Sequence, residues 1–199
     1  SCDIQECSGG HPEWHLQMDL FKAVKLINPT LSIIHPPCTY MSKAGARWMY
    51  PSAGIISQDR YLKAVRAKEF FMECLNLDIK YLAIENPTPL KVINLPCESQ
   101  SIQPYQFGEP FSKRTLLWLK NLPLLQSTKF INEYQPYLPS NTSGKFKGQK
   151  YSNGFSKNQK QHSKTFKGIA EAMATQWGEY ILSGKTIKNV KNLQLNIFG

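Results

Sequence analysis

Two short apolar runs organise the pattern of this chain, and a polar segment containing proline follows each of them directly. Leu31–Ile34 comes before the sequence HPPC at 35–38, and residues 80–84 come before ENP at 85–87. Short apolar runs of this kind are typical of buried strands. Proline ends the pairing of a strand, because it has no N–H to donate to a ladder. We therefore predict two buried strands that stop at residues 34 and 84.

Apolar residues recur at helical spacing in residues 20–27, 57–77 and 168–182, which we predict to be amphipathic helices. Asp19 and Ser57 stand directly before the first two of these segments, and both residue types are good N-caps. The helix over 57–77 would connect the two predicted strands as a crossover, so these strands should run parallel with their carboxyl ends at one edge.

The edge formed by those two strand ends carries the candidate chemistry. Cys38 and Glu85 follow the two strands, and ligands bind at this edge in open α/β sheets. A thiol nucleophile beside a carboxyl group that carries a proton suits covalent catalysis on an electron-poor ring. Plainer roles stay open, because Cys38 could be an inert buried thiol and Glu85 a helix cap or the partner of a lysine.

Length and composition indicate the size class, the relation to membranes and the redox compartment of the protein. The 199 residues suffice for one domain with a sizeable core. No run of 18 or more apolar residues occurs, so we expect no membrane partner. Five scattered cysteines indicate no disulfide framework and favour a reducing, cytoplasmic compartment.

The positive charge of the chain lies mostly in its second half. The net charge is +10, and residues 129–199 hold 11 of the 24 Lys and Arg but only 3 of the 14 Asp and Glu. A basic half of this kind favours a polyanion such as nucleic acid, although it can also serve solubility alone. Six lysines and interleaved aromatics in residues 139–166 predict a basic, flexible loop. Residues 183–199 form a basic, weakly alternating tail, either an edge strand or disordered.

The two strand-end motifs resemble those of a known enzyme family. PPC at 36–38, followed by Ser42 and Ala44-Gly45, resembles the catalytic loop of DNA (cytosine-5) methyltransferases, and ENP at 85–87 resembles their Glu-Asn-Val motif. More narrowly, the chain is similar to short methyltransferase-like proteins of bacteriophages and prophages, over residues 1–182. The resemblance implies a Rossmann-like α/β sandwich with a mostly parallel sheet and a hairpin edge. It also implies location in the cytoplasm of a bacterial or phage-infected cell.

The resemblance further implies a reaction. S-adenosylmethionine would methylate carbon 5 of a cytosine flipped out of DNA. Cys38 would add to ring carbon 6 while Glu85 holds or protonates ring nitrogen 3. Asn86 and the Pro36-Pro37 backbone would fix the geometry.

Cofactor contacts are implied at Asp3, Asp19 and Pro36. The family uses an acidic residue at the place of Asp3 to hold the ribose, and one at the place of Asp19 to hold the adenine amino group. A first strand and a glycine-rich loop normally come before the Asp3 strand, and the chain contains neither. This difference implies either a truncated chain or a protein that does not bind the cofactor.

Substrate contacts are expected from four side chains. Ser42 and Arg47 lie in or near the cysteine loop, and Lys113 and Arg114 lie in a hairpin predicted over residues 103–119. That hairpin resembles the family sequence Y-G-x-P-Q-x-R-x-R, but its arginine pattern is broken here. Trp48 could also contact substrate, although burial is the more common fate of such a ring.

Other interpretations remain open at this stage. HPPC is also similar to the [DNS]-P-P-[YFW] loop of adenine-N6 and cytosine-N4 methyltransferases, with Tyr40 as a substitute for the missing ring. A DNA-binding relative without catalysis is the alternative from another class. A zinc site formed by Cys2, Cys7, His11 and His15 is weaker, because the spacing matches no common zinc module.

Overall fold

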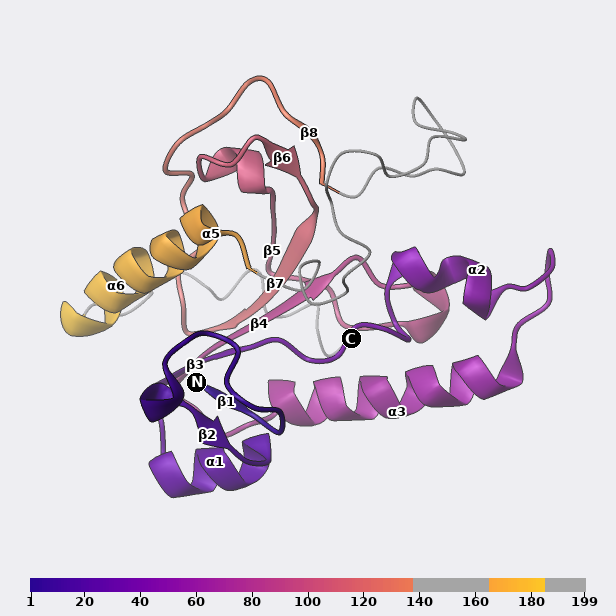
Figure 1. Cartoon of the computed structure of the whole chain (residues 1–199), viewed down its shortest axis with the longest axis horizontal. Helices are drawn as coiled ribbons and strands as arrows, with labels where there is room; N and C mark the ends of the chain where they lie inside the picture. Colours follow the sequence, from indigo (N-terminus) through magenta and orange to yellow (C-terminus); the bar gives the residue numbers. More distant parts are fainter. Residues whose placement is uncertain (138–164, 185–199) are drawn as a thin grey trace.

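The computed structural model describes residues 1–137 and 165–184 of the chain (Figure 1). The strands are β1 (Cys2–Asp3), β2 (Leu16–Gln17), β3 (Leu31–Ile34), β4 (Tyr81–Pro87), β5 (Gln100–Ile102), β6 (Phe111–Ser112), β7 (Thr115–Lys120) and β8 (Gln135–Pro136). The helices are α1 (Leu20–Ile27), α2 (Ala46–Met49), α3 (Gln58–Leu75), α5 (Lys167–Ala172) and α6 (Gly178–Leu182). The predictions for the loop 139–166 and the tail 183–199 lie almost entirely outside the described residues.

The central sheet of the described residues has four strands in the order β3-β4-β7-β5. β3 and β4 are parallel, as predicted, whereas β7 runs antiparallel to both β4 and β5. Two smaller parallel pairs, β1-β2 and β6-β8, stand apart from this sheet. The protein is therefore α/β with mixed pairing, where we expected a mostly parallel sheet.

The two strands predicted from the apolar runs are present, although β4 is longer than expected. It continues through Glu85 and Asn86 to Pro87, because Thr115 and the residues after it in β7 pair with this end. Proline is tolerated there as the last residue of the strand.

The predicted helices are confirmed, and their N-caps follow the expected chemistry. Asp19 Oδ1 accepts hydrogen bonds from the backbone N–H groups of Phe21 and Lys22, and Ser57 Oγ accepts one from Arg60 N–H. The third helix consists of α5 and α6 joined by a π-helical turn, Met173–Trp177. The hairpin predicted over residues 103–119 is present in part, because β5 and β7 pair antiparallel. However, β5 ends at Ile102, before the predicted start, and residues 103–114 between the two strands contain a 3-10 turn (Pro104–Gln106) and β6.

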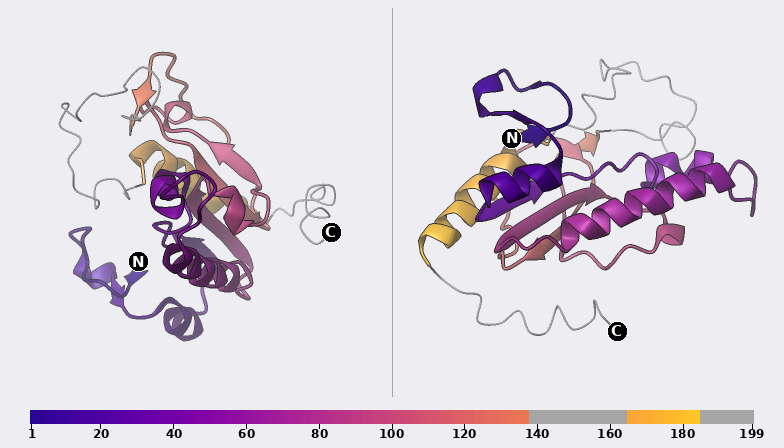
Figure 2. Two further views of the ribbon diagram at one scale, coloured as in Figure 1. Left: turned by 90° about the vertical axis from the view of Figure 1, so that its right-hand side faces the viewer. Right: turned by 90° about the horizontal axis from the view of Figure 1, so that it is seen from below.

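Side chains of the central sheet alternate between two separate cores. Leu82 and Ile84 of β4 join a core with Phe71 of α3, whereas Tyr81 and Ala83 join a core that contains Trp177. Helix α3 therefore covers one face of the sheet and the α5–α6 helix covers the other, which gives three layers (Figure 2).

None of the five cysteines, all of which lie in the described part, forms a disulfide. Among the helices of residues 1–137 and 165–184, none is both long and apolar enough to cross a bilayer.

Truncation of Phe71 should test the larger core. This ring is fully buried and meets Trp118 edge to face, with 4.9 Å between ring centroids. We expect Phe71→Ala to lower the free energy of unfolding by about 3–5 kcal/mol, measured by urea denaturation. Leu62→Ala, on the exposed side of the same helix, is the matched control and should change it by less than about 0.5 kcal/mol. Equal effects of both variants would contradict the packing described here.

Candidate active site at the ends of β3 and β4

The register of β3 on β4 brings the two motifs together. Ile34 pairs with Ile84, so the residues that follow them lie at the same level of the sheet. His35 Nδ1 lies 2.8 Å from Glu85 Oε2, within hydrogen-bonding distance. His35 is about half exposed and Glu85 only 19 % exposed, so this contact lies at the mouth of the site.

Asn86 fastens the proline loop to β4. Its side chain is 1 % exposed, and its Nδ2 donates a hydrogen bond to the carbonyl of Pro36 at 3.0 Å. Asn86 Oδ1 is also buried and has no hydrogen-bond partner among the described residues. The two adjacent residues therefore have different roles. Glu85 faces the site, and Asn86 supports the loop that carries Cys38.

The loop that carries Cys38 is a compact turn docked on the segment after β4. The carbonyl of Cys38 accepts hydrogen bonds from the backbone N–H groups of Met41 and Ser42, at 3.0 and 2.9 Å. Leu90 N–H donates to the Met41 carbonyl at 2.7 Å, and this hydrogen bond holds the turn against the segment that follows β4. Ser42, a predicted substrate contact, is buried and bridges to Pro89 through its backbone.

Arg60 of α3 also supports the cysteine loop, and this role was not predicted from the sequence. Its Nη2 donates to the carbonyl of Thr39 at 2.7 Å, and its guanidinium lies 5.0 Å from the ring of Tyr40. A Cβ atom on Gly45 would lie 2.6 Å from this Nη2, so only glycine fits there without movement. One signal was available in the sequence, since a cation in the first turn of a helix opposes the helix dipole.

Three ionisable side chains share the electrostatic environment of the site. Burial raises the pKa of the Cys38 thiol, and the negative charge of Glu85 raises it further, while Lys113 acts in the opposite direction. Burial lowers the pKa of Lys113, against the effect of Glu85 and Cys38. The Lys113 ammonium also lies 5.6 Å from the ring of Tyr137 and 5.7 Å from that of Phe166.

The two arginines predicted to contact substrate each have a partner within the protein. Arg114 donates to Ser101 Oγ at 3.0 Å and pairs with Glu98 at 3.2 Å, on the β5 side of the sheet. Arg47 stacks on Trp48, 4.5 Å from its ring centroid. Our expectation that Trp48 is buried was wrong, because 58 % of it is exposed.

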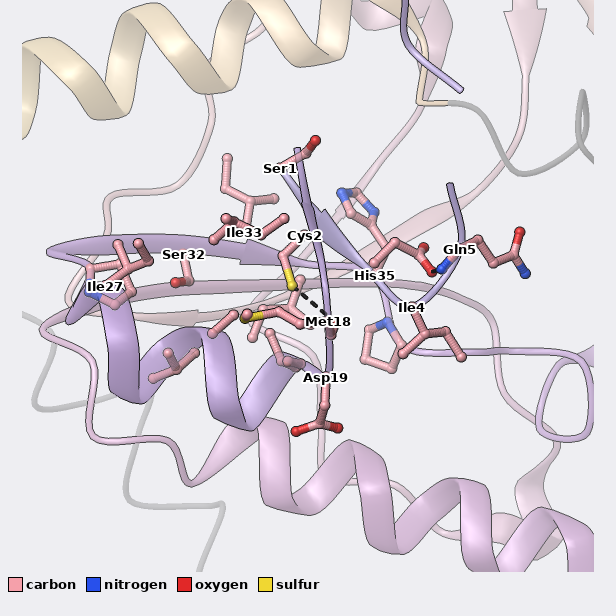
Figure 3. Close-up of a pocket in the computed structure, with 18 of the residues that line it drawn as sticks. Ser1, Cys2, Ile4, Gln5, Met18, Asp19, Ile27, Ser32, Ile33 and His35 are labelled. Atoms are coloured by element: carbon pink, nitrogen blue, oxygen red, sulfur yellow. Dashed lines mark hydrogen bonds between the residues drawn. The ribbon is translucent and has the colours of Figure 1, made fainter. Parts of the chain in front are cut away.

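The three predicted cofactor residues line one cavity. This cavity has a volume of about 830 Å³ and lies between β1, β3 and α1 (Figure 3). Asp3, Asp19 and Pro36 all line it, together with mainly apolar side chains. Asp3 Oδ1 accepts from the backbone N–H of Gln5, and Asp19 caps α1, so both carboxylates are held in place.

The residues of the zinc interpretation make other contacts. His11 stacks on Trp14 and contacts Glu13, and His15 is hydrogen-bonded to Ser1 Oγ and the Gln5 carbonyl. Within residues 1–137 and 165–184, no three His, Cys, Asp or Glu side chains gather as metal ligands would.

Comparison of the chain with protein-family models, with curated proteins and with solved structures finds no match. The geometry offers a partly buried thiol, a carboxyl group in contact with an imidazole, and a lysine whose charge favours the thiolate.

The reactivity of Cys38 should report these charges. At neutral pH, Glu85→Gln should lower the pKa of Cys38 and speed its alkylation by iodoacetamide by a factor of about 2–10. Lys113→Met should raise that pKa and slow alkylation by a similar factor, about 2–10. The rate is measured by mass spectrometry of the Cys38 peptide, with the exposed Cys97 as internal control. An unchanged rate in both variants would show that neither charge acts on the thiol.

Proposed function

We propose that this protein is an S-adenosylmethionine-dependent methyltransferase acting on carbon 5 of cytosine in DNA, with a Rossmann-like catalytic domain over residues 1–182. The observation that carries the proposal is the placement of Cys38 and Glu85 at adjacent ends of two parallel strands, with Asn86 holding the proline loop between them. A thiol and a carboxyl group in this arrangement can act on the same planar ring.

In the proposed reaction, Cys38 and Glu85 act on the ring together. The Cys38 thiolate forms a bond to ring carbon 6, and the Glu85 carboxyl group donates a proton to ring nitrogen 3. This pair of steps places electron density on carbon 5, which takes the methyl group that S-adenosylmethionine supplies. Loss of the carbon 5 proton to water and return of the nitrogen 3 proton to Glu85 then restore the double bond between carbons 5 and 6, and the bond between sulfur and carbon 6 breaks to release the Cys38 thiolate.

In the proposed reaction, Lys113 and His35 have roles that follow from their positions around Cys38 and Glu85. Because the pKa of Cys38 is raised, the thiol carries its proton in the free protein at neutral pH. Lys113 stabilises the thiolate once it forms, because its positive charge lowers the pKa of Cys38. His35 contacts Glu85 and is about half exposed, so it can exchange a proton between that carboxyl group and solvent.

The cavity beside the site fits the nucleoside part of the cofactor. Its volume of about 830 Å³ is within the range of small-molecule sites. Asp3 can accept hydrogen bonds from ribose hydroxyls, and Asp19 can accept one from the adenine amino group. Pro36 belongs to both the cavity and the cysteine loop, so it joins the cofactor side to the substrate side.

A catalytically inactive DNA-binding relative is the second candidate. One observation favours it, because none of the described residues that line the cavity is a glycine, although a backbone cradle for the rest of the cofactor would be needed there. The net charge of +10 supports a DNA partner in either case. Amino methylation is less well supported, since Tyr40 packs against Arg60 instead of serving as a free stacking ring.

Methyl transfer to unmethylated DNA is the direct test. We expect 5-methylcytosine in digests analysed by mass spectrometry, and we expect none from Cys38→Ser. Glu85→Gln should slow transfer by about 10²–10⁴, whereas Cys97→Ser, at an exposed thiol to which no role is assigned, should leave it unchanged. Methylation at an exocyclic amine, or activity that survives Cys38→Ser, would contradict the proposal. DNA binding without methylation by the wild-type protein would favour the inactive relative.

A further inference from the structure

The short helix that follows the cysteine loop carries exposed apolar side chains. Trp48 of α2 is 58 % exposed, and Tyr50 and Ile55, which follow it in the chain, are exposed as well. Tryptophan is a large residue that is highly buried on average in folded proteins. Exposed apolar side chains that gather on one short segment, here residues 48–55, indicate a surface that contacts another molecule.

The backbone beneath Trp48 is held in place. Met49, the next residue, is fully buried in the core that contains residues of α3. Its carbonyl accepts a hydrogen bond from Ser57 N–H at 2.9 Å, and Tyr50 N–H donates to the Ala46 carbonyl at 2.8 Å. Because Met49 is anchored in the core, the packing of α2 itself keeps the Trp48 ring at the surface.

This ring is close to the candidate active site along the chain. Ser42 N–H donates to the Cys38 carbonyl at 2.9 Å, and Gly45 N–H donates to the Ser42 carbonyl at 3.0 Å. Two consecutive turns thus connect Cys38 to α2, which Figure 1 shows beyond the carboxyl end of β3. Each turn holds its ends within about 7 Å, so the Cα atom of Trp48 lies within about 20 Å of that of Cys38. This reach corresponds to about six base steps of about 3.4 Å each in a DNA strand.

The surroundings of Trp48 are positively charged. The guanidinium of Arg47 lies over the Trp48 ring, 4.5 Å from its centroid, and Lys43 on the preceding turn is exposed. Residues 20–58 contain no Asp or Glu, so no acidic side chain of this segment opposes these cations. Proteins bind single-stranded nucleic acid through this combination, because phosphates contact the cations and bases stack on the ring. The charge therefore favours a nucleic acid over a protein as the partner of this surface.

We propose that Trp48 stacks on a base that lies close to the target cytosine in the substrate DNA. The inference rests on the proposed function, from which it takes DNA as the partner. A cytosine that leaves the stack exposes the faces of its neighbouring bases. Arg47 lies over one face of the Trp48 ring, which leaves the other face for such a base. The ring then replaces part of the lost stacking, and the charge of Arg47 attracts the DNA backbone.

Two other exposed rings of the described residues provide comparisons. Phe130 is as exposed as Trp48, at 58 %, but it packs edge to face against Tyr105. Trp14 stacks on the ring of His11, with 4.3 Å between centroids. Neither ring lies on the segment that continues from the cysteine loop, so Phe130 is suited as a control for Trp48.

Tryptophan fluorescence of the full chain tests the stacking directly. Of the four tryptophans, Trp118 and Trp177 are buried, so Trp14→Phe leaves Trp48 as the exposed emitter. In that variant, a single-stranded DNA of about 12 nucleotides with one central cytosine should quench this emission and protect it from acrylamide. Addition of Trp48→Phe should abolish the change while DNA binding, followed by the anisotropy of labelled DNA, persists.

The affinity for the same DNA is the second measurement. Trp48→Ala should weaken binding by about 5- to 150-fold, the range expected for loss of one base-stacking ring, and Trp48→Phe should retain most of the affinity. Phe130→Ala removes an equally exposed ring and should bind like the wild type. Urea denaturation should give the same midpoint for Trp48→Ala and the wild type, which separates weaker binding from unfolding.

Each contrary outcome identifies what fails. Trp48 emission that does not change while DNA binds, or equal losses of affinity in Trp48→Ala and Phe130→Ala, would overturn the inference and leave the proposed reaction standing. Emission that changes with protein concentration in the absence of DNA would assign the surface to a second copy of the chain. Stacking without formation of 5-methylcytosine would uphold the inference and contradict the proposed reaction. Absence of DNA binding by the wild-type chain would overturn both.

Discussion

The parallel pairing of β3 with β4 is the constraint on which the candidate site depends. It sets His35 level with Glu85, and the hydrogen bond from Asn86 to the Pro36 carbonyl then fixes how the loop leaves β3. A shift by one residue would turn Glu85 to the opposite face and Asn86 away from the loop. The two cores on either side of the sheet prevent that shift, because β4 sends alternate side chains into each of them.

The parts of the fold that local pattern dictates were predictable from the sequence. The two apolar runs became β3 and β4, and Asp19 and Ser57 cap the helices they precede. Cap and strand chemistry involves residues close in sequence, so the pattern contains it in full. That Cys38 and Glu85 follow adjacent strand ends was expected from one further rule, that the carboxyl ends of parallel strands lie at one edge of the sheet.

Features that depend on distant residues could not be predicted in the same way. The antiparallel partner β7 extends β4 beyond Ile84, and nothing near Ile84 in the sequence indicates this. Arg60 lies 21 residues after Thr39 in the sequence and contacts the cysteine loop only because α3 packs beside it, so local sequence does not indicate this role. Burial was the more common expectation for Trp48, but the residue is 58 % exposed and contacts Arg47, an arrangement that its local sequence does not indicate.

Asn86 Oδ1 and Arg60 Nε are buried without hydrogen-bond partners among the described residues. Each such group costs about 1–3 kcal/mol of folding free energy. Both belong to residues that hold the cysteine loop, so the loop is kept in place at the expense of global stability. Screens that select only for thermal resistance should accumulate substitutions at these two positions first and lose the geometry of the site as they do so. The most stable variants of this chain are therefore poor guides to its working form.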